Sequence, residues 1–368
     1  MDLLSQIALV FTKGLSNSAI RKLVDLYPDV DVFALPKSEL RTMFGKHTDI
    51  AESIASKSTF ARAEEELLFC EKNHIRPLFF TDPDYPARLN RRETDDCPAL
   101  LYCLGDTDLN PERSIAVVGT RRSTPMGRDN TDRLVRELTA YGPHIISGLA
   151  YGIDTAAHTA ALDHGLPTVA VLGHGLDRIY PTSNRPLAKR IMENGGALVT
   201  EYPSGTAINP RHFPARNRII AALSDATVVV EASEKGGALI TAAIAGSYQR
   251  EVFAVPGRLS DTYSKGTNNL IATQRALLMR NARDIAFQMG WPIEGEQLTI
   301  EGMEAQQTLS KEEQQVVEIL KEHERLTLDE LVNLTGHPLA KMAAILFNIE
   351  LQGLVHTLPG HTYQLAHR

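Results

Sequence analysis

The stretch SIAVVGTRRS, residues 114–123, marks the point at which the sequence pattern changes and the fold is decided. From here on, short apolar runs of strand length alternate with stretches of helical length. The apolar runs are SIAVVG (114–119), HIIS (144–147), TVAVLG (168–173), ALVT (197–200), ATVVVE (226–231) and EVFAV (251–255). The helical stretches include residues 129–140, 154–164, 187–194 and 238–249. This alternation predicts an α/β fold with a parallel, doubly wound sheet.

Further segments flank this core, which we place at residues 76–290. Residues 1–75 carry apolar side chains at helical spacing, so we expect a helical domain of the SAM or helix-hairpin-helix kind. Such a domain either docks to protein or contacts a DNA backbone, and KGLS (13–16) lacks the paired glycines typical of the second role. Residues 291–307 are polar and acidic and are predicted to be a linker. Residues 308–368 follow the order of a winged helix, with three helices and then a hairpin.

Composition excludes several classes of protein. Hydrophobic residues make up 43% of the chain and charged residues 23%, as in ordinary soluble globular proteins. No run of 18 apolar residues and no basic segment with a cleavage site is present, so we expect a cytoplasmic protein without a membrane span or signal peptide. Cys70, Cys97 and Cys103 are too few and too scattered for a disulfide framework or a zinc site. We expect no metal and no cofactor.

Charge is distributed unevenly along the chain. The net charge of −7 argues against a generic nucleic-acid binder, which usually has a basic excess. Residues 113–200, however, hold 10 basic and 7 acidic side chains, whereas residues 301–368 hold 5 basic and 10 acidic ones. A site for a polyanion is therefore expected in the middle of the chain.

Loops rich in glycine follow the predicted strands. Because ligands of such sheets bind at the carboxyl ends of the strands, these loops are expected to share one edge. They contain Gly119, Thr120 and Arg121 after the first strand, Ser147, Gly148 and Tyr151 after the second, and Lys235, Gly236, Gly237 and Thr241 after the fifth. Backbone N–H groups of such loops bind anions. Together with the arginine-bearing stretch after the fourth strand, they predict a site for several phosphates in a row.

That stretch, RHFPARNR (211–218), opens a helix with Pro214 in its first turn. Arg216 and Arg218 project from nearly opposite sides of a helix, so we expect one to reach the ligand and the other to brace the site through Glu201 or Glu231. The ring of Phe213 beside basic groups suits a stacked base of single-stranded nucleic acid. The alternative is that Phe213 only closes the edge of the sheet.

Signatures of catalysis are weak in this sequence. The turn after the first strand does not fit G-x-G-x-x-G, and no G-x-x-x-x-G-K-[ST] occurs, which argues against dinucleotide enzymes and P-loop nucleotidases. Asp154 and His158 lie four residues apart on one helix and suit acid–base chemistry. We favour a helix cap for Asp154 and a structural hydrogen bond for His158. The pattern therefore predicts a binding site rather than an enzyme.

The chain resembles a known family in many motifs that occur in family order. They are DPDYPARL (82–89), IAVVGTRR (115–122), SGLAYGIDTAAH (147–158), GHGLDRIYPTSN (173–184), TEYPSG (200–205), FPARNRIIAALS (213–224), VVEA (229–232), ALITA (238–242), FAVPG (253–257) and KGTNNLI (265–271). By these motifs, residues 81–291 are similar to the DNA-processing protein A family, DprA or Smf. The resemblance implies a helical N-terminal domain, an extended Rossmann-like core and often a winged-helix tail.

The resemblance also implies a function. Members bind single-stranded DNA without catalysis, protect incoming strands during natural transformation, and load the recombinase RecA onto them. They form homodimers through the core. The motifs and the loops together nominate as DNA-binding Gly119, Thr120, Arg121, Ser147, Gly148, Tyr151, Arg211, Phe213, Arg216, Asn217, Arg218, Lys235, Gly236, Gly237 and Thr241.

Departures from the family pattern mark the same loops. Gly236-Gly237-Ala238 stands where the family usually has Ser-Gly-Ser, which leaves backbone N–H groups but no hydroxyl donors. Tyr151 and Thr182 occupy positions that are basic in many members, and Arg275 stands where a glycine is usual. Tyr151 is expected to replace a phosphate contact by stacking.

Two alternatives belong to other functional classes. A nucleotide-sugar hydrolase on a related Rossmann-like fold would carry P-G-G-x-G-T, and this chain has EKGGALIT (234–241) in the comparable place. A protein adaptor would use only the helical and winged domains. The predicted recognition helix, 338–351, has Lys341 as its only basic residue. We therefore expect the winged helix to dock protein or inhibit the core rather than bind DNA, with a weak contact below neutral pH through His356, His361 and His367.

Overall fold

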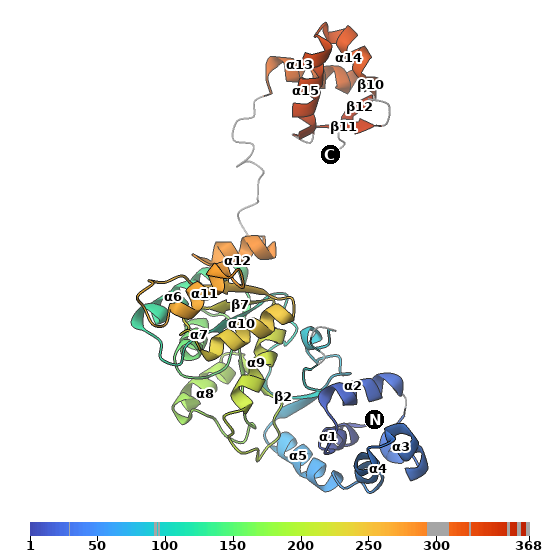
Figure 1. Cartoon of the computed structure of the whole chain (residues 1–368), viewed down its shortest axis with the longest axis vertical. Helices are drawn as coiled ribbons and strands as arrows, with labels where there is room; N and C mark the ends of the chain where they lie inside the picture. The colour runs from blue at the N-terminus through green and yellow to red at the C-terminus, as the bar shows by residue number, and fades with distance from the viewer. Residues whose placement is uncertain are drawn as a thin grey trace. The chain divides into compact units, whose positions relative to one another are not determined.

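The computed structural model describes residues 1–28, 30–91, 94, 96–292, 309–323, 325–351, 354–358 and 362–365. The chain divides into two compact units, Met1–Gly295 and Glu296–Arg368, drawn in Figure 1. Apart from positions 291 and 292, the predicted linker 291–307 lies outside the described residues. Among the described residues, no helix is both long and apolar enough to cross a membrane.

A nine-stranded sheet organises the first unit, in the order β1-β2-β6-β5-β4-β3-β7-β8-β9. The strands are β1 (Ile75–Phe79), β2 (Leu100–Gly105), β3 (Ser114–Val118), β4 (His144–Ser147), β5 (Thr168–Val171), β6 (Ala197–Thr200), β7 (Ala226–Val229), β8 (Glu251–Ala254) and β9 (Leu277–Leu278). All six predicted runs form strands, and the strands from β6 to β9 in this order are parallel. The predicted doubly wound α/β core is confirmed. Two features were not predicted from the sequence: β9, and the β1–β2 hairpin, which pairs antiparallel with β6.

Helices cover both faces of this sheet. Alternate side chains of a strand point to opposite faces, and on the central strands the side chains of both faces are apolar and must be buried. On β3, Ile115 and Val117 pack with α6 (Pro125–Leu138), α7 (Ile153–Asp163) and α12 (Ala282–Met289). Ala116 and Val118 face the other way, toward α9 (His212–Leu223) and α10 (Gly237–Ser247). Two further helices, α8 (Arg185–Glu193) and α11 (Lys265–Ala272), complete this part of the unit. Figure 1 shows α9 and α10 side by side on one face.

The N-terminal helices share an apolar core with the β1–β2 hairpin. They are α1 (Leu3–Val10), α2 (Asn17–Leu26), α3 (Lys37–Phe44), α4 (Thr48–Ala55) and α5 (Phe60–Lys72). Glu66 of α5 is 1% exposed and accepts hydrogen bonds from the Ser204 backbone N–H (2.9 Å) and hydroxyl (2.6 Å), in the loop before α9. The domain boundary near residue 75 stays a prediction, since the compact unit continues through it.

The second unit is a winged helix, as predicted. It contains α13 (Lys311–Glu322), β10 (Leu326–Thr327), α14 (Leu328–Thr335), α15 (Leu339–Leu351), β11 (Val355–Leu358) and β12 (Thr362–Leu365), with strand order β10-β12-β11. Lys341 of α15 pairs with Glu312 of α13 at 2.5 Å. On the outer face of α15, Leu339 and Phe347 are exposed. His356 is exposed, whereas His361 and His367 lie outside the described residues.

Candidate nucleic-acid interface

A pocket of about 320 Å³ opens at the end of β3, between the start of α7 and the starts of α9 and α10. Most of the predicted site residues line it, namely Gly119, Thr120, Arg121, Phe213, Arg216, Asn217, Gly236, Gly237 and Thr241. A smaller adjoining pocket of about 50 Å³ adds Gly148 and Tyr151, and Arg121, Phe213 and Arg216 line both. The loops expected to share one edge of the sheet therefore do so.

Close backbone packing explains the glycines of these loops. A Cβ on Gly119 would lie 2.5 Å from Ile153, and one on Gly148 would lie 2.6 Å from both Arg216 and Asp154. Gly152 adopts φ +80°, a conformation that L side chains rarely take, and precedes α7. Gly237 differs, because open space surrounds its Cβ position. The first three glycines hold strand ends and helix together, and Gly237 leaves the start of α10 open.

Arg121 is exposed, and its guanidinium lies over the ring of Phe213, 5.4 Å from the ring centroid. The Phe213 ring is 5.6 Å from that of Tyr180, centroid to centroid, and Tyr180 also lines the small pocket. Tyr151 is 50% exposed and Tyr180 is 42% exposed. Tyr180 was not predicted from the sequence; its signal is a tyrosine at the end of the loop that follows the third predicted strand.

Arg216 braces the site from inside. It is 3% exposed, and its Nη1 donates to the carbonyl oxygens of Gly148 (2.7 Å) and Val171. Burial lowers the pKa of Arg216 to about 10, and the nearby Asp154 carboxylate opposes that shift. Burial raises the pKa of Asp154. The Arg216 side chain thus forms a wall of the pocket while its Nε and Nη1 donors are engaged within the protein.

Arg218 is the second brace, as one of the two arginines was expected to be. Its guanidinium forms two hydrogen bonds with Glu201, at 2.6 and 2.7 Å. Of the two partners expected for the bracing arginine, Glu201 is the one that pairs with it, and Glu231 is not. Glu231 instead accepts hydrogen bonds from the Thr124 backbone N–H (3.0 Å) and hydroxyl (2.5 Å), because the turn after β3 lies directly against it.

Asp154 and His158 are both buried on α7. The predicted cap is wrong, because Gly152 is the N-cap and Asp154 lies within the first turn, where it accepts the Ala150 N–H at 3.4 Å. The predicted structural role of His158 is confirmed by its Nδ1, which is 2.7 Å from the Thr168 hydroxyl. Burial lowers the pKa of His158 to about 3, so the ring is neutral.

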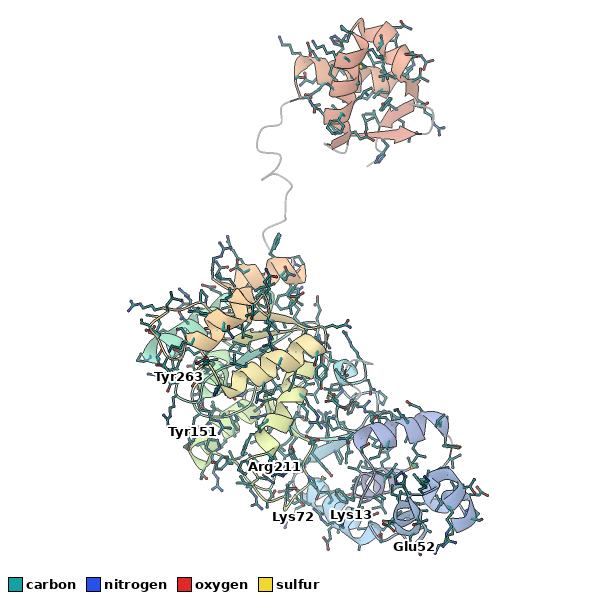
Figure 2. The ribbon with its side chains drawn as sticks, viewed as in Figure 1. Lys13, Glu52, Lys72, Tyr151, Arg211 and Tyr263 are labelled. Atoms are coloured by element: carbon teal, nitrogen blue, oxygen red, sulfur yellow. The ribbon has the colours of Figure 1, made fainter. Side chains whose placement is uncertain are left out.

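The remaining predicted residues do not line the two pockets. Ser147 is fully buried, and its hydroxyl donates to the Val117 carbonyl at 2.7 Å, so this side chain is not available to a ligand. Arg211 is exposed at the N-cap of α9, and Figure 2 labels it together with Tyr151 on the first unit. Lys235 is exposed beside the pocket and lines a groove along α10. Their roles in DNA binding stay predictions.

The electrostatics of the large pocket favour an anion. Neither α9 nor α10 has a side-chain hydrogen bond at its N-cap, and residues of both first turns line the pocket. Helix starts carry a partial positive charge and unpaired N–H groups. Arg121 adds a full charge, with no ion pair found for it among the described residues. The arrangement can bind phosphate groups beside aromatic rings.

Comparisons with known proteins agree with this geometry. The DNA recombination-mediator protein A family model matches residues 76–290, and the DprA winged helix domain matches residues 303–361. Protein Smf of Synechocystis is 34% identical over 327 residues, covering 80% of this chain and 81% of the relative. DNA processing protein DprA of Streptococcus pneumoniae is 36% identical over 275 residues, covering 74% and 93%.

Solved structures of relatives match the fold as well. The X-ray structure of Streptococcus pneumoniae DprA has a TM-score of 0.67 at 32% identity, covering 78% of this chain and 98% of that one. DNA processing protein A from Helicobacter pylori, described for its single-stranded DNA binding mode, has a TM-score of 0.52 at 32% identity and covers 59% and 97%. On sequence and fold, the chain belongs to the DNA recombination-mediator protein A family.

Proposed function

We propose that this chain binds single-stranded DNA along the pocket edge, without cleaving it. The observation that carries this proposal is the guanidinium of Arg121 over Phe213, between the open starts of α9 and α10. Cations and helix N-termini bind phosphates, and aromatic rings beside them accept stacked bases. Because every base has a π-face, binding of this kind tolerates any sequence.

The relatives support a role in recombination. The Helicobacter pylori protein is described as binding single-stranded DNA, and the family as recombination mediators. We infer that this protein acts in the cytoplasm on strands taken up in natural transformation, which it protects and onto which it loads RecA. Binding along the pocket edge accounts for protection, because a strand held there is shielded from nucleases.

A binding role without turnover is supported by the carboxylates of the site, because each of them already interacts with another group of the protein. Asp154 lies buried beside Arg216, Glu201 pairs with Arg218, and Glu231 holds the Thr124 turn. A general base must reach the proton it abstracts, and these groups are already committed to internal partners.

A homodimer through β9 is part of the proposal. Leu277 and Leu278 form a two-residue strand at the sheet edge and are 41% and 45% exposed. Phe287 on α12, the helix that follows β9 in the chain, is 89% exposed. An exposed apolar sheet edge is a natural place for pairing with a second chain.

The test is a titration of the full-length protein with a fluorescent oligonucleotide, single-stranded or as blunt duplex, with ATP hydrolysis and DNA nicking measured in parallel. We expect tighter binding to the single strand, and no turnover above that of Arg121→Ala. Equal affinity for both forms of DNA would contradict the proposal. So would robust nucleotide hydrolysis that Arg121→Ala abolishes.

A further inference from the structure

We propose that Tyr180, rather than Phe213, presents the face on which a base of the bound strand stacks, and that His174 positions it. This inference rests on the proposed single-stranded DNA binding and names a contact within it. The loop between β5 and α8 thereby joins the site, although none of its residues was nominated from the sequence as a DNA contact.

The surroundings of the two rings distinguish them. Phe213 is half-buried, and its ring is bordered by Arg121, by Tyr180 and by the backbone of Gly173, where a Cβ would lie 3.0 Å from Phe213 Cδ1. Tyr180 leans on Phe213 with 42% of its surface still exposed. Phe213 is therefore the support, and Tyr180 the ring with area left for a ligand.

Tyr180 is held by a buried histidine. The Tyr180 backbone N–H donates to His174 Nε2 at 3.2 Å, and His174 Nδ1 lies 2.9 Å from the Gly175 carbonyl. Burial lowers the pKa of His174, which favours the neutral ring, and the Gly175 carbonyl beside Nδ1 favours the proton on that nitrogen. In that tautomer Nδ1–H donates to Gly175, and Nε2 accepts from Tyr180.

A second anchor lies on the other side of Tyr180. Asn184 is buried, and its amide nitrogen donates to the Leu149 carbonyl (2.9 Å) and the Thr155 hydroxyl (3.0 Å). These contacts tie the end of the loop to the turn before α7. With both flanks fixed, the ring is ordered before DNA arrives, which reduces the entropy lost on binding.

The ligand that this ring fits is the base of a nucleotide whose phosphate is bound by Arg121. Arg121, Tyr151 and Tyr180 line the same small pocket, so a charged group and two partly exposed rings lie within one nucleotide's reach. Stacking of one base on an aromatic side chain contributes about 1–3 kcal/mol. Removing the Tyr180 ring is expected to weaken binding about fivefold or more, at an unchanged salt slope.

The experiment compares a normal oligonucleotide with one of equal length that is abasic throughout its centre, using the full-length protein. Tyr180→Leu should lose affinity for the normal strand only, while Tyr180→Phe stays within about twofold of the native protein on both. The fluorescence of a strand that carries 2-aminopurine should be quenched when the native protein or Tyr180→Phe binds it. Binding of Tyr180→Leu should quench this fluorescence much less. His174→Ala should resemble Tyr180→Leu, with folding checked by thermal unfolding.

The outcomes separate the two proposals. If the native protein fails to bind the single strand at all, the proposed function is wrong. Two results would show that only the role of Tyr180 is wrong, provided that the native protein binds the single strand. In the first, Tyr180→Leu binds the normal strand with native affinity. In the second, Tyr180→Leu loses as much affinity for the abasic strand as for the normal strand. Loss of quenching in Phe213→Leu with full quenching in Tyr180→Leu would assign the stacking face to Phe213.

Discussion

The Arg121 guanidinium lies 5.4 Å from the centre of the Phe213 ring, and the two residues follow different strands of the sheet. This pair joins the turn after β3 to the first turn of α9. It holds a cation on an apolar ring at the mouth of a pocket formed by helix starts. The charge is thus oriented before any ligand is bound.

Replacement of Arg121 by alanine should weaken binding of single strands of every sequence alike. For each phosphate that the variant no longer neutralises, the slope of log affinity against log salt should fall by about 0.7. Fluorescence titrations at several salt concentrations measure this. Arg133→Ala, an equal change of charge at an exposed position on α6, is the matched control and should leave the slope unchanged.

Replacement of Arg216 by methionine should act on stability first. It removes the donor for the buried carbonyls of Gly148 and Val171, and each unsatisfied buried group costs about 1–3 kcal/mol. We expect the free energy of unfolding in urea to fall by about 2 kcal/mol or more. Arg121→Met should leave that free energy almost unchanged, and equal stability of the two variants would argue against an internal brace.

Acid should destabilise the first unit through its buried histidines. The folded-state pKa of His158 is about 3, below its usual value of 6.5. Between about pH 6.5 and pH 3, this histidine is therefore protonated in the unfolded chain and neutral in the folded chain, so the unfolded state binds more protons. Stability is then fully present above about pH 6.5 and is lost as the pH falls toward 3. At pH 5.5 His158 alone should cost about 1.4 kcal/mol, and His158→Gln should flatten the decline measured by urea unfolding.

Leu277→Glu should convert the expected dimer into a monomer. A carboxylate on the β9 edge would bring two like charges together across a paired interface. Light scattering at micromolar concentration should show the mass halved. Leu68→Glu, at an exposed leucine of α5, serves as the control, and a monomeric native protein would contradict the proposed dimer.

Removal of residues 309–368 should leave affinity for single-stranded DNA within about twofold. The only basic side chain of α15, Lys341, is paired with Glu312, and Leu339 and Phe347 give the helix an apolar outer face. Such a surface is suited to protein rather than to phosphates. A tenfold loss, about 1.4 kcal/mol, in a truncated protein that still folds would show that the winged helix binds DNA.

How far the sequence predicts this structure depends on how local each signal is. The six central strands follow from short apolar runs, and the site edge follows from the rule that parallel strands end together. The β1–β2 hairpin was missed because its strands are joined by a long connection without a tight turn, so only the pairing with β6 identifies it. Pairing of this kind is set by tertiary contacts between segments distant in sequence, which a local pattern does not reveal.

The local sequence pattern also could not predict the structural roles of Arg216 and Arg218. Arg216 is engaged by carbonyls that lie 68 and 45 residues away in the chain, and those hydrogen bonds exist only once the sheet has formed. Helical spacing correctly placed Arg216 and Arg218 on different sides. It could not tell that both would be engaged by internal partners, which leaves Arg121 as the exposed cation of the pocket.

Glu66 and Ser204 bind each other across 138 residues of sequence, one in the N-terminal helices and one in the loop before α9. Loss of either residue would leave buried polar groups without this partner, so the helical segment and the loop before α9 are energetically coupled. A helical segment that lacked Glu66 would leave the Ser204 N–H and hydroxyl without this acceptor. The helical segment is thus fastened to the core by a buried polar contact as well as by its shared apolar core.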